Sequence, residues 1–129
     1  MSKPNGQTQT CSTTKQKGDA AEDRALQHLQ SHGLQMLQRN YRTPGRGGGE
    51  IDLVMREPDG TWVFVEVRQR RQQQHGGALA SITYAKQKRI VFAARHCLLN
   101  LAQLPPCRFD VVAVEGDELH WYKAAFDAG

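Results

Sequence analysis

The sequence has little cysteine and no long apolar run. Its 129 residues include three cysteines without a Cys-x-x-Cys pair, which argues against a disulfide framework and a zinc ribbon. The longest apolar run, residues 90–101, is broken by Arg95, His96 and Asn100, so it is too polar to cross a bilayer. Residues 1–14 lack the apolar stretch of a signal peptide. These absences predict a cytoplasmic protein that does not enter a membrane.

The overall composition is that of one ordinary globular domain, with 39% hydrophobic and 23% charged residues. A second domain would leave both cores small at this length. The net charge of +4 favours anionic partners, nucleic acid first, although a solvated basic surface is an alternative explanation. The composition leaves the oligomeric state open and is compatible with a homodimer.

Patterns along the chain predict a disordered polar tail over residues 1–14 and a single domain over 15–126. Alanine and leucine at positions 21, 25 and 29 recur every four residues, which indicates a helix that Gly33 ends in a left-handed conformation. Strands are expected over 34–42, 50–56, 61–70, 108–114 and 118–123, and a second helix over about 81–101, stopped by Pro105 and Pro106. The order αβββαββ predicts an α/β fold with a mixed sheet flanked by helices.

The strands over 50–56 and 61–70 are joined by a short turn and should form a hairpin. Their alternating apolar residues share one face only if paired residue numbers add to an even value, because a slip of one residue reverses both faces. The residues assigned to this face are Ile51, Leu53, Met55, Val63, Val65 and Val67. With the turn centred near Asp59, that value is 118. Asp52 then lies opposite Glu66, and Glu50 lies opposite Arg68. All four side chains are predicted to point to the same face.

Directly opposed carboxylates have Cβ atoms roughly 4.5–5.5 Å apart and repel each other unless a cation lies between them. Mg²⁺ or Mn²⁺ is the usual cation at such a pair, bound by the carboxylates, water and a substrate phosphate. The alternative is an ordinary surface hairpin with an ion pair between Glu50 and Arg68. Bulky apolar residues on the same face, Trp62 and Phe64, favour a partly buried functional pair.

Three segments of the chain resemble the bacterial YraN family: GEIDLV at 49–54, FVEVRQR at 64–70 and RFDVV at 108–112. The segment KGDAAE at 17–22 resembles the N-terminal helix of that family. The resemblance extends over roughly residues 15–126. The family is similar to the PD-(D/E)xK nuclease superfamily, which has a restriction-endonuclease-like core. The similarity to Holliday-junction resolvases is a weaker analogy at the level of the fold.

This resemblance implies a metal-dependent nuclease that hydrolyses phosphodiester bonds in DNA or RNA with Mg²⁺ or Mn²⁺. Asp52 and Glu66 match the metal-binding acids, and Glu22 matches a helix carboxylate that completes some of these sites. Arg68 stands where the superfamily has lysine. Arginine can hold a phosphate but is a poor general base, so Lys86 is considered as a substitute. A nuclease-like fold that has lost catalysis and only binds nucleic acid or a protein partner is the alternative.

Basic residues gather near the second helix and in the loops beside it. Cations in the first turns of a helix oppose its macrodipole, which favours a role in binding a ligand such as phosphate, although a solvated charged face is an equally common explanation. The glycine-rich loop at 45–49 lacks the GK[ST] ending of a nucleotide-binding P-loop. The predicted nucleic-acid-binding residues are Arg70, Arg71, Lys86, Lys88 and Arg89, with Arg42 and Arg46 close to the glycine-rich loop.

Overall fold

The computed structural model describes residues 14–69 and 82–129. Residues 1–13 of the tail predicted over 1–14, and the predicted binding residues Arg70 and Arg71, lie outside the described residues. The described elements follow the predicted order αβββαββ: α1 (Thr14–Ser31), β1 (Gln35–Arg42), β2 (Glu50–Arg56), β3 (Trp62–Gln69), α3 (Tyr84–Cys97), β4 (Cys107–Glu115) and β5 (Glu118–Phe126). Helix α1 begins one residue before the predicted start of the domain.

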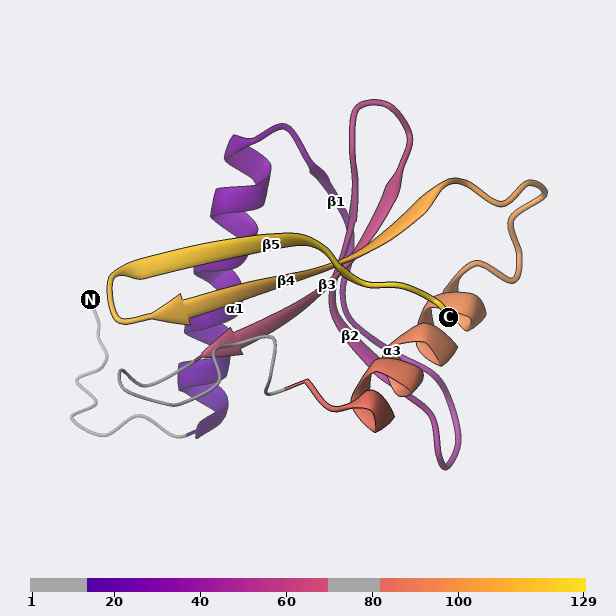
Figure 1. Cartoon of the computed structure of the whole chain (residues 1–129), viewed down its shortest axis with the longest axis horizontal. Coiled ribbons are helices and arrows are strands. Elements are labelled where there is room, and N and C mark those ends of the chain that lie inside the picture. Colours follow the sequence, from indigo (N-terminus) through magenta and orange to yellow (C-terminus); the bar gives the residue numbers. More distant parts are fainter. Residues whose placement is uncertain (1–13, 70–81) are drawn as a thin grey trace, which may run out of the picture.

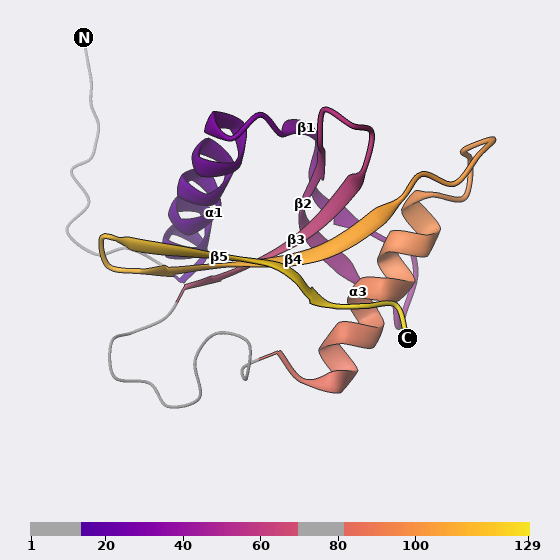
Figure 2. The same cartoon turned by 45° about the horizontal axis from the view of Figure 1, so that its top comes forward.

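The strands form one mixed sheet in the order β1-β2-β3-β4-β5. Neighbouring strands are antiparallel except β3 and β4, which are parallel and are joined by the connection that contains α3. Helix α1 packs on one face of this strongly twisted sheet and α3 on the other (Figures 1 and 2). The α/β fold with helices on both sides of a mixed sheet is therefore confirmed.

Helix α1 is held by the residues that the sequence pattern identifies. Ala21, Ala25 and Leu29 are buried against the sheet. Gly33 has a φ of 93°, and the Leu34 amide donates to the Leu29 carbonyl at 3.1 Å. This is the expected glycine-terminated helix end, and it turns the chain into β1.

Helix α3 is shorter than predicted at both ends. Its N-cap is Thr83, whose hydroxyl oxygen accepts from the Lys86 amide at 3.1 Å. The helix ends at Cys97, and the Leu98, Leu99 and Leu101 amides then bond three residues back in tight turns. The predicted stop at the two prolines was wrong, because the helix ends at Cys97; Leu98 just beyond it is still buried, and residues 99–104 are exposed.

The predicted hairpin register is confirmed: Leu53 pairs with Val65 and Met55 with Val63, so the residue numbers add to 118. One assignment of faces was wrong. Ile51 packs with the α3 cluster, whereas Leu53 and Met55 pack with the α1 cluster. Between the pairs Arg39–Leu53 and Tyr41–Ile51, the strand β1 contains Asn40 in a left-handed conformation with φ 54°. Beyond Asn40, both Tyr41 and Ile51 pack with the α3 cluster.

Within the part of the chain that the structure describes, neither helix is long and apolar enough to cross a membrane.

Candidate functional site

The candidate site lies where β2 and β3 separate. Their ladder ends at the pair Leu53–Val65. The next residue of β2, Asp52, uses its carboxylate to accept a hydrogen bond from the Val67 amide at 2.8 Å. A side chain thus takes the place of a backbone partner, and the Asp52 carboxyl lies in the opening between the two strands.

Glu66 contributes the second carboxylate and is almost completely buried, with 6% of its side chain exposed. Two cations lie beside its Oε2 atom. The Arg68 Nε is 3.5 Å away, from two positions further along β3, and the Lys86 Nζ is 3.8 Å away, from the first turn of α3. The sheet and α3 therefore converge on this carboxylate.

The charge of Glu66 disfavours the ionised form of Asp52. Burial and the charge of Glu66 raise the pKa of Asp52 to about 7, against the smaller opposing effects of the Val67 amide and Lys86. Burial also raises the pKa of Glu66, although Lys86, Arg68 and a hydrogen bond with Asp52 lower it in part. Asp52 consequently binds a proton near neutral pH, where an ordinary aspartate is ionised.

Glu22 approaches the same pair from α1. Burial and the charge of Asp52 raise its pKa, which places the two carboxyl groups within electrostatic reach of each other. Arg39 of β1 donates from its Nε to Glu22 at 3.3 Å and from its Nη1 to Asp23 at 2.7 Å. Glu22 is therefore positioned at the edge of the pair, with Arg39 offsetting its charge.

Glu50 has a different partner from the one considered in the surface-hairpin alternative. It pairs with Arg42 across β1, with 3.4 Å between Arg42 Nε and the carboxylate. The β2–β3 ladder ends before Glu50 and Arg68. The charge of Glu50 still raises the pKa of Asp52 and of Glu66, so it belongs to the same electrostatic cluster.

A basic pocket of about 330 Å³ adjoins these carboxylates. Glu50 and Lys86 line it, and each of them also acts on the Asp52–Glu66 pair. Its remaining lining residues are Arg42, Thr43, Gly45, Gly47, Gly48, Gly49, Arg89 and Ile90. Three cationic side chains over a wall of glycine backbone make a pocket suited to a phosphate group.

The glycines of this wall are required by close packing. Thr43 closes the loop, because its amide donates to the Gly49 carbonyl at 3.1 Å and its hydroxyl accepts from the Gly49 amide at 2.8 Å. A Cβ on Gly48 would lie 1.8 Å from the Thr43 hydroxyl oxygen, and one on Gly49 would lie 2.1 Å from the Arg89 carbonyl oxygen. Only glycine lets the loop approach α3 so closely.

The structure brings together most of the residues singled out from the sequence. Asp52, Glu66 and Arg68 form the centre, and Glu22 borders it. Lys86 reaches Glu66 directly, which the sequence indicated only by its position early in the helix. Arg89 lines the basic pocket, whereas Lys88 lies over the Tyr84 ring, 5.2 Å from its centroid, and faces a second pocket.

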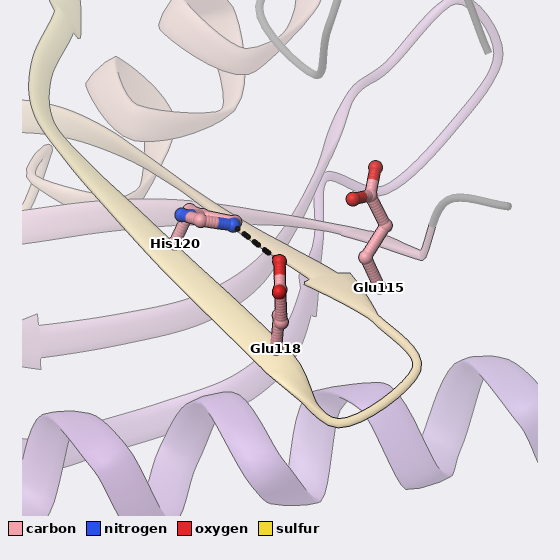
Figure 3. A group of neighbouring side chains, drawn as sticks. All are labelled: Glu115, Glu118 and His120. Carbon is pink, nitrogen blue, oxygen red and sulfur yellow. Dashed lines mark hydrogen bonds and ion pairs between the residues drawn. The ribbon is translucent and has the colours of Figure 1, made fainter. Parts of the chain in front are cut away.

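A second group of potential metal ligands was not anticipated from the sequence. Glu115, Glu118 and His120 surround the β4–β5 turn, with their ligand atoms within 4.8 Å of one another (Figure 3). His120 and Glu118 form a contact of 3.3 Å, and both are well exposed. The signal was the two-residue spacing of Glu118 and His120 on one strand face, opposite Glu115. An exposed ion pair accounts for this group, and we assign it no role.

The donor set at the centre fits a hard divalent cation. Two buried carboxylates with raised pKa values supply the oxygen ligands that Mg²⁺ and Mn²⁺ prefer. Asp52 and Glu66 would hold the ion, and the third carboxylate of Glu22 lies close enough to act on it electrostatically. A bound cation would offset the free-energy cost of burying these carboxylate charges.

Comparisons with known proteins place the chain in a family. The model of the "Uncharacterised protein family UPF0102" matches residues 21–114. The chain belongs to the UPF0102 family. A UPF0102 protein of Albidiferax ferrireducens is 67% identical over 116 residues, which cover 90% of this chain and 91% of the relative. One of Paracidovorax citrulli is 66% identical over 117 residues, covering 91% and 87%.

The UPF0102 match is consistent with the resemblance to the YraN family found in the sequence. The matched residues include the whole of β2 and β3 and most of α1 and β4. Glu22, Asp52, Glu66, Arg68 and Lys86 all lie within them. The candidate site thus belongs to the part of the chain that defines the family.

Proposed function

We propose that this protein is a divalent-metal-dependent nuclease of the PD-(D/E)xK type that hydrolyses phosphodiester bonds in nucleic acid. The observation that carries the proposal is the pair of the partly buried Asp52 and the buried Glu66 at the opening between β2 and β3, with Lys86 against Glu66. Buried like charges of this kind are costly to a fold and typical of metal-assisted chemistry. A cytoplasmic location, where such a protein meets nucleic acid, is part of the proposal.

The proposed role of each residue follows from its position in the site. Asp52 and Glu66 hold Mg²⁺ or Mn²⁺, which when bound supplies positive charge where negative charge builds up on the phosphate. Arginine is a poor general base and binds phosphate well, so the role of Arg68 is to hold a phosphate oxygen. Lys86 projects from α3 toward both Glu66 and the basic pocket, and it orients the attacking water or the phosphate.

The basic pocket supports the choice of a nucleic-acid substrate. Arg42, Lys86 and Arg89 surround a glycine wall beside the carboxylates. In a phosphodiester backbone, one phosphate can reach the metal held by Asp52 and Glu66 while the neighbouring phosphate occupies this pocket. The net charge of +4 favours the approach of such a polyanion.

The test is cleavage of branched, single-stranded and duplex substrates with Mn²⁺ by the wild type and by Glu66→Gln. We expect Glu66→Gln to lower the cleavage rate by about 100-fold or more, because an ion-binding and charge-stabilising group is lost. Glu118→Gln, which removes an exposed glutamate of the β4–β5 turn, is the matched control and should cleave like the wild type. Unchanged cleavage by Glu66→Gln would contradict the proposal, as would inactivity of the wild type on every substrate.

A second candidate function is nucleic-acid binding without catalysis, and Arg68 favours it because arginine cannot serve as the general base that lysine provides. Under this alternative, titration with Mg²⁺ or Mn²⁺ gives no binding at Asp52 and Glu66, while binding to nucleic acid remains sensitive to salt. If Asp52 and Glu66 form a working metal site with Lys86 as the nearby lysine, the titration detects Mg²⁺ or Mn²⁺ binding at these two residues. The two candidates are therefore separated by one metal titration.

A further inference from the structure

The outer face of α3 exposes aromatic and basic side chains in one stripe. Tyr84, Lys88, Phe92 and Arg95 follow one another at helical spacing. Tyr84 is 73% exposed and Phe92 is 53% exposed. The same helix buries Ile90 and Ala94 on its opposite side, so these two rings are additional to the core. Large exposed rings grouped on one face are typical of a binding surface.

A second pocket, of about 420 Å³, runs along this stripe. It adjoins the basic pocket, since Gly47 and Arg89 line both. The last described residues of the chain, 127–129, border its other side, next to α3 (Figure 2). The two pockets are therefore neighbours, and we refer to them together as the groove, which borders Lys86 in the first pocket and Phe92 in the second.

The charges of the groove select an anionic ligand. Helix α3 contains no acidic residue, and Lys88, Arg89 and Arg95 line the second pocket. Asp127 is the acidic residue among the described lining residues of that pocket. Cations at helical intervals beside stacking rings match the alternation of phosphate and base in an unpaired strand. In a duplex the bases are stacked within the helix, and the rings would have no base to contact.

We propose that this groove binds a single-stranded segment of nucleic acid, with bases stacked on Phe92 and Tyr84 and phosphates paired with Lys88, Arg89 and Arg95. The inference rests on the proposed function in that the bound strand continues into the Asp52–Glu66 site. It narrows the substrate class to nucleic acids with an unpaired region, such as single strands, flaps or frayed junctions. Phe92 is the central ring, because it lines the pocket and projects between Lys88 and Arg95 along the helix.

The experiment measures affinity in EDTA, without cleavage, for a labelled single strand of about 15 nucleotides and for a blunt duplex of the same length. Phe92→Ala is expected to weaken single-strand binding by about 5- to 100-fold. Duplex affinity is expected to change by less than about twofold, because duplex binding depends on phosphate contacts. Leu104→Ala, which truncates a residue that is 76% exposed and outside both pockets, is the matched control.

Unchanged single-strand affinity of Phe92→Ala overturns the inference and points to a protein partner for the stripe. Equal weakening for single strand and duplex also overturns it, because stacking on unpaired bases would then not be the cause. Far-ultraviolet circular dichroism verifies that Phe92→Ala remains folded. Mn²⁺-dependent cleavage by the wild type is measured in a separate experiment. A failure of the single-strand inference is then distinguished from a failure of the proposed nuclease function.

Discussion

The carboxyl of Asp52 combines a structural and a proposed chemical role. Its oxygen satisfies the Val67 amide where the β2–β3 ladder ends, and it lies beside a second buried acid. Burial and Glu66 raise the pKa of Asp52 to about 7. The folded protein therefore binds a proton at Asp52 between about pH 4 and pH 7, whereas the unfolded chain has released it.

This pKa shift predicts how stability depends on pH in EDTA. The stabilising contribution of protonated Asp52 is present below pH 4 and is lost as the pH rises through about 7. Asp52→Asn keeps an oxygen that accepts from Val67 and removes the charge. We expect Asp52→Asn to increase the free energy of unfolding more at pH 8 than at pH 4. The effects at the two pH values should differ by up to about 4 kcal/mol.

Urea unfolding of wild type and variant at both pH values measures this difference. Asp117→Asn, at an exposed position in the β4–β5 turn, is the control and should give nearly the same change at pH 4 and pH 8. Equal effects of Asp52→Asn at the two pH values would show that the folded protein does not resist ionisation of this carboxyl.

At the scale of the elements, the glycine-rich loop fixes the distance between β2 and α3. Gly49 lies so close to the helix that a Cβ would be 2.1 Å from the Arg89 carbonyl oxygen and 3.3 Å from the Ala93 Cβ. The same contact positions Arg89 over the basic pocket. A change at Gly49 therefore acts on both stability and the pocket.

Gly49→Ala is expected to destabilise the fold by about 1–3 kcal/mol, because the helix must move away from the strand. Gly18→Ala provides a matched control in α1, where a Cβ would meet nothing within 4 Å. That substitution should instead stabilise by about 0.5–1 kcal/mol, as alanine does in a helix. Thermal unfolding of the two variants gives opposite shifts under this account, and a neutral Gly49→Ala would contradict it.

The sequence predicted the elements and the hairpin register because these depend on local periodicity. Alternation in β2 and β3 was enough to predict the register that pairs Leu53 with Val65 and Met55 with Val63. It could not predict that Ile51 changes faces, since the alternation of β2 carries no sign of the left-handed Asn40 that lies beside it on β1. The end of α3 at Cys97 depends on where the sheet stops covering the helix, which no local pattern encodes.

The candidate site was predictable in its carboxylates and less so in its cations. Asp52 and Glu66 lie on adjacent strands of one hairpin, so the alternation of side chains along the two strands predicts that they are neighbours. The contact between Lys86 and Glu66 depends on how α3 returns over the sheet, and Arg39 neutralises Glu22 through packing of α1 on β1. Such contacts between distant segments require the three-dimensional structure.

Over the whole molecule, two adjoining pockets and a net positive charge make up the surface that we propose binds a polyanion. Arg89 belongs to both pockets and is the residue whose loss should affect the whole groove. Each phosphate neutralised by a cation contributes to the dependence of affinity on salt.

Arg89→Gln is expected to weaken nucleic-acid binding and to reduce the slope of log affinity against log salt by about 1. Arg56→Gln, at an exposed position of β2 outside both pockets, should leave the slope unchanged. Fluorescence anisotropy titrations over a series of salt concentrations measure both. Equal slopes for the wild type and Arg89→Gln would show that the groove does not contact phosphates.

The most direct test of the account is the position of Mn²⁺ in crystals soaked with this ion, located by its anomalous scattering. The account predicts a peak coordinated by the Asp52 and Glu66 carboxylates, absent from crystals of the Glu66→Gln variant. A peak at Glu115, Glu118 and His120 with none between Asp52 and Glu66 would contradict the account, because the buried pair would then not be a metal centre.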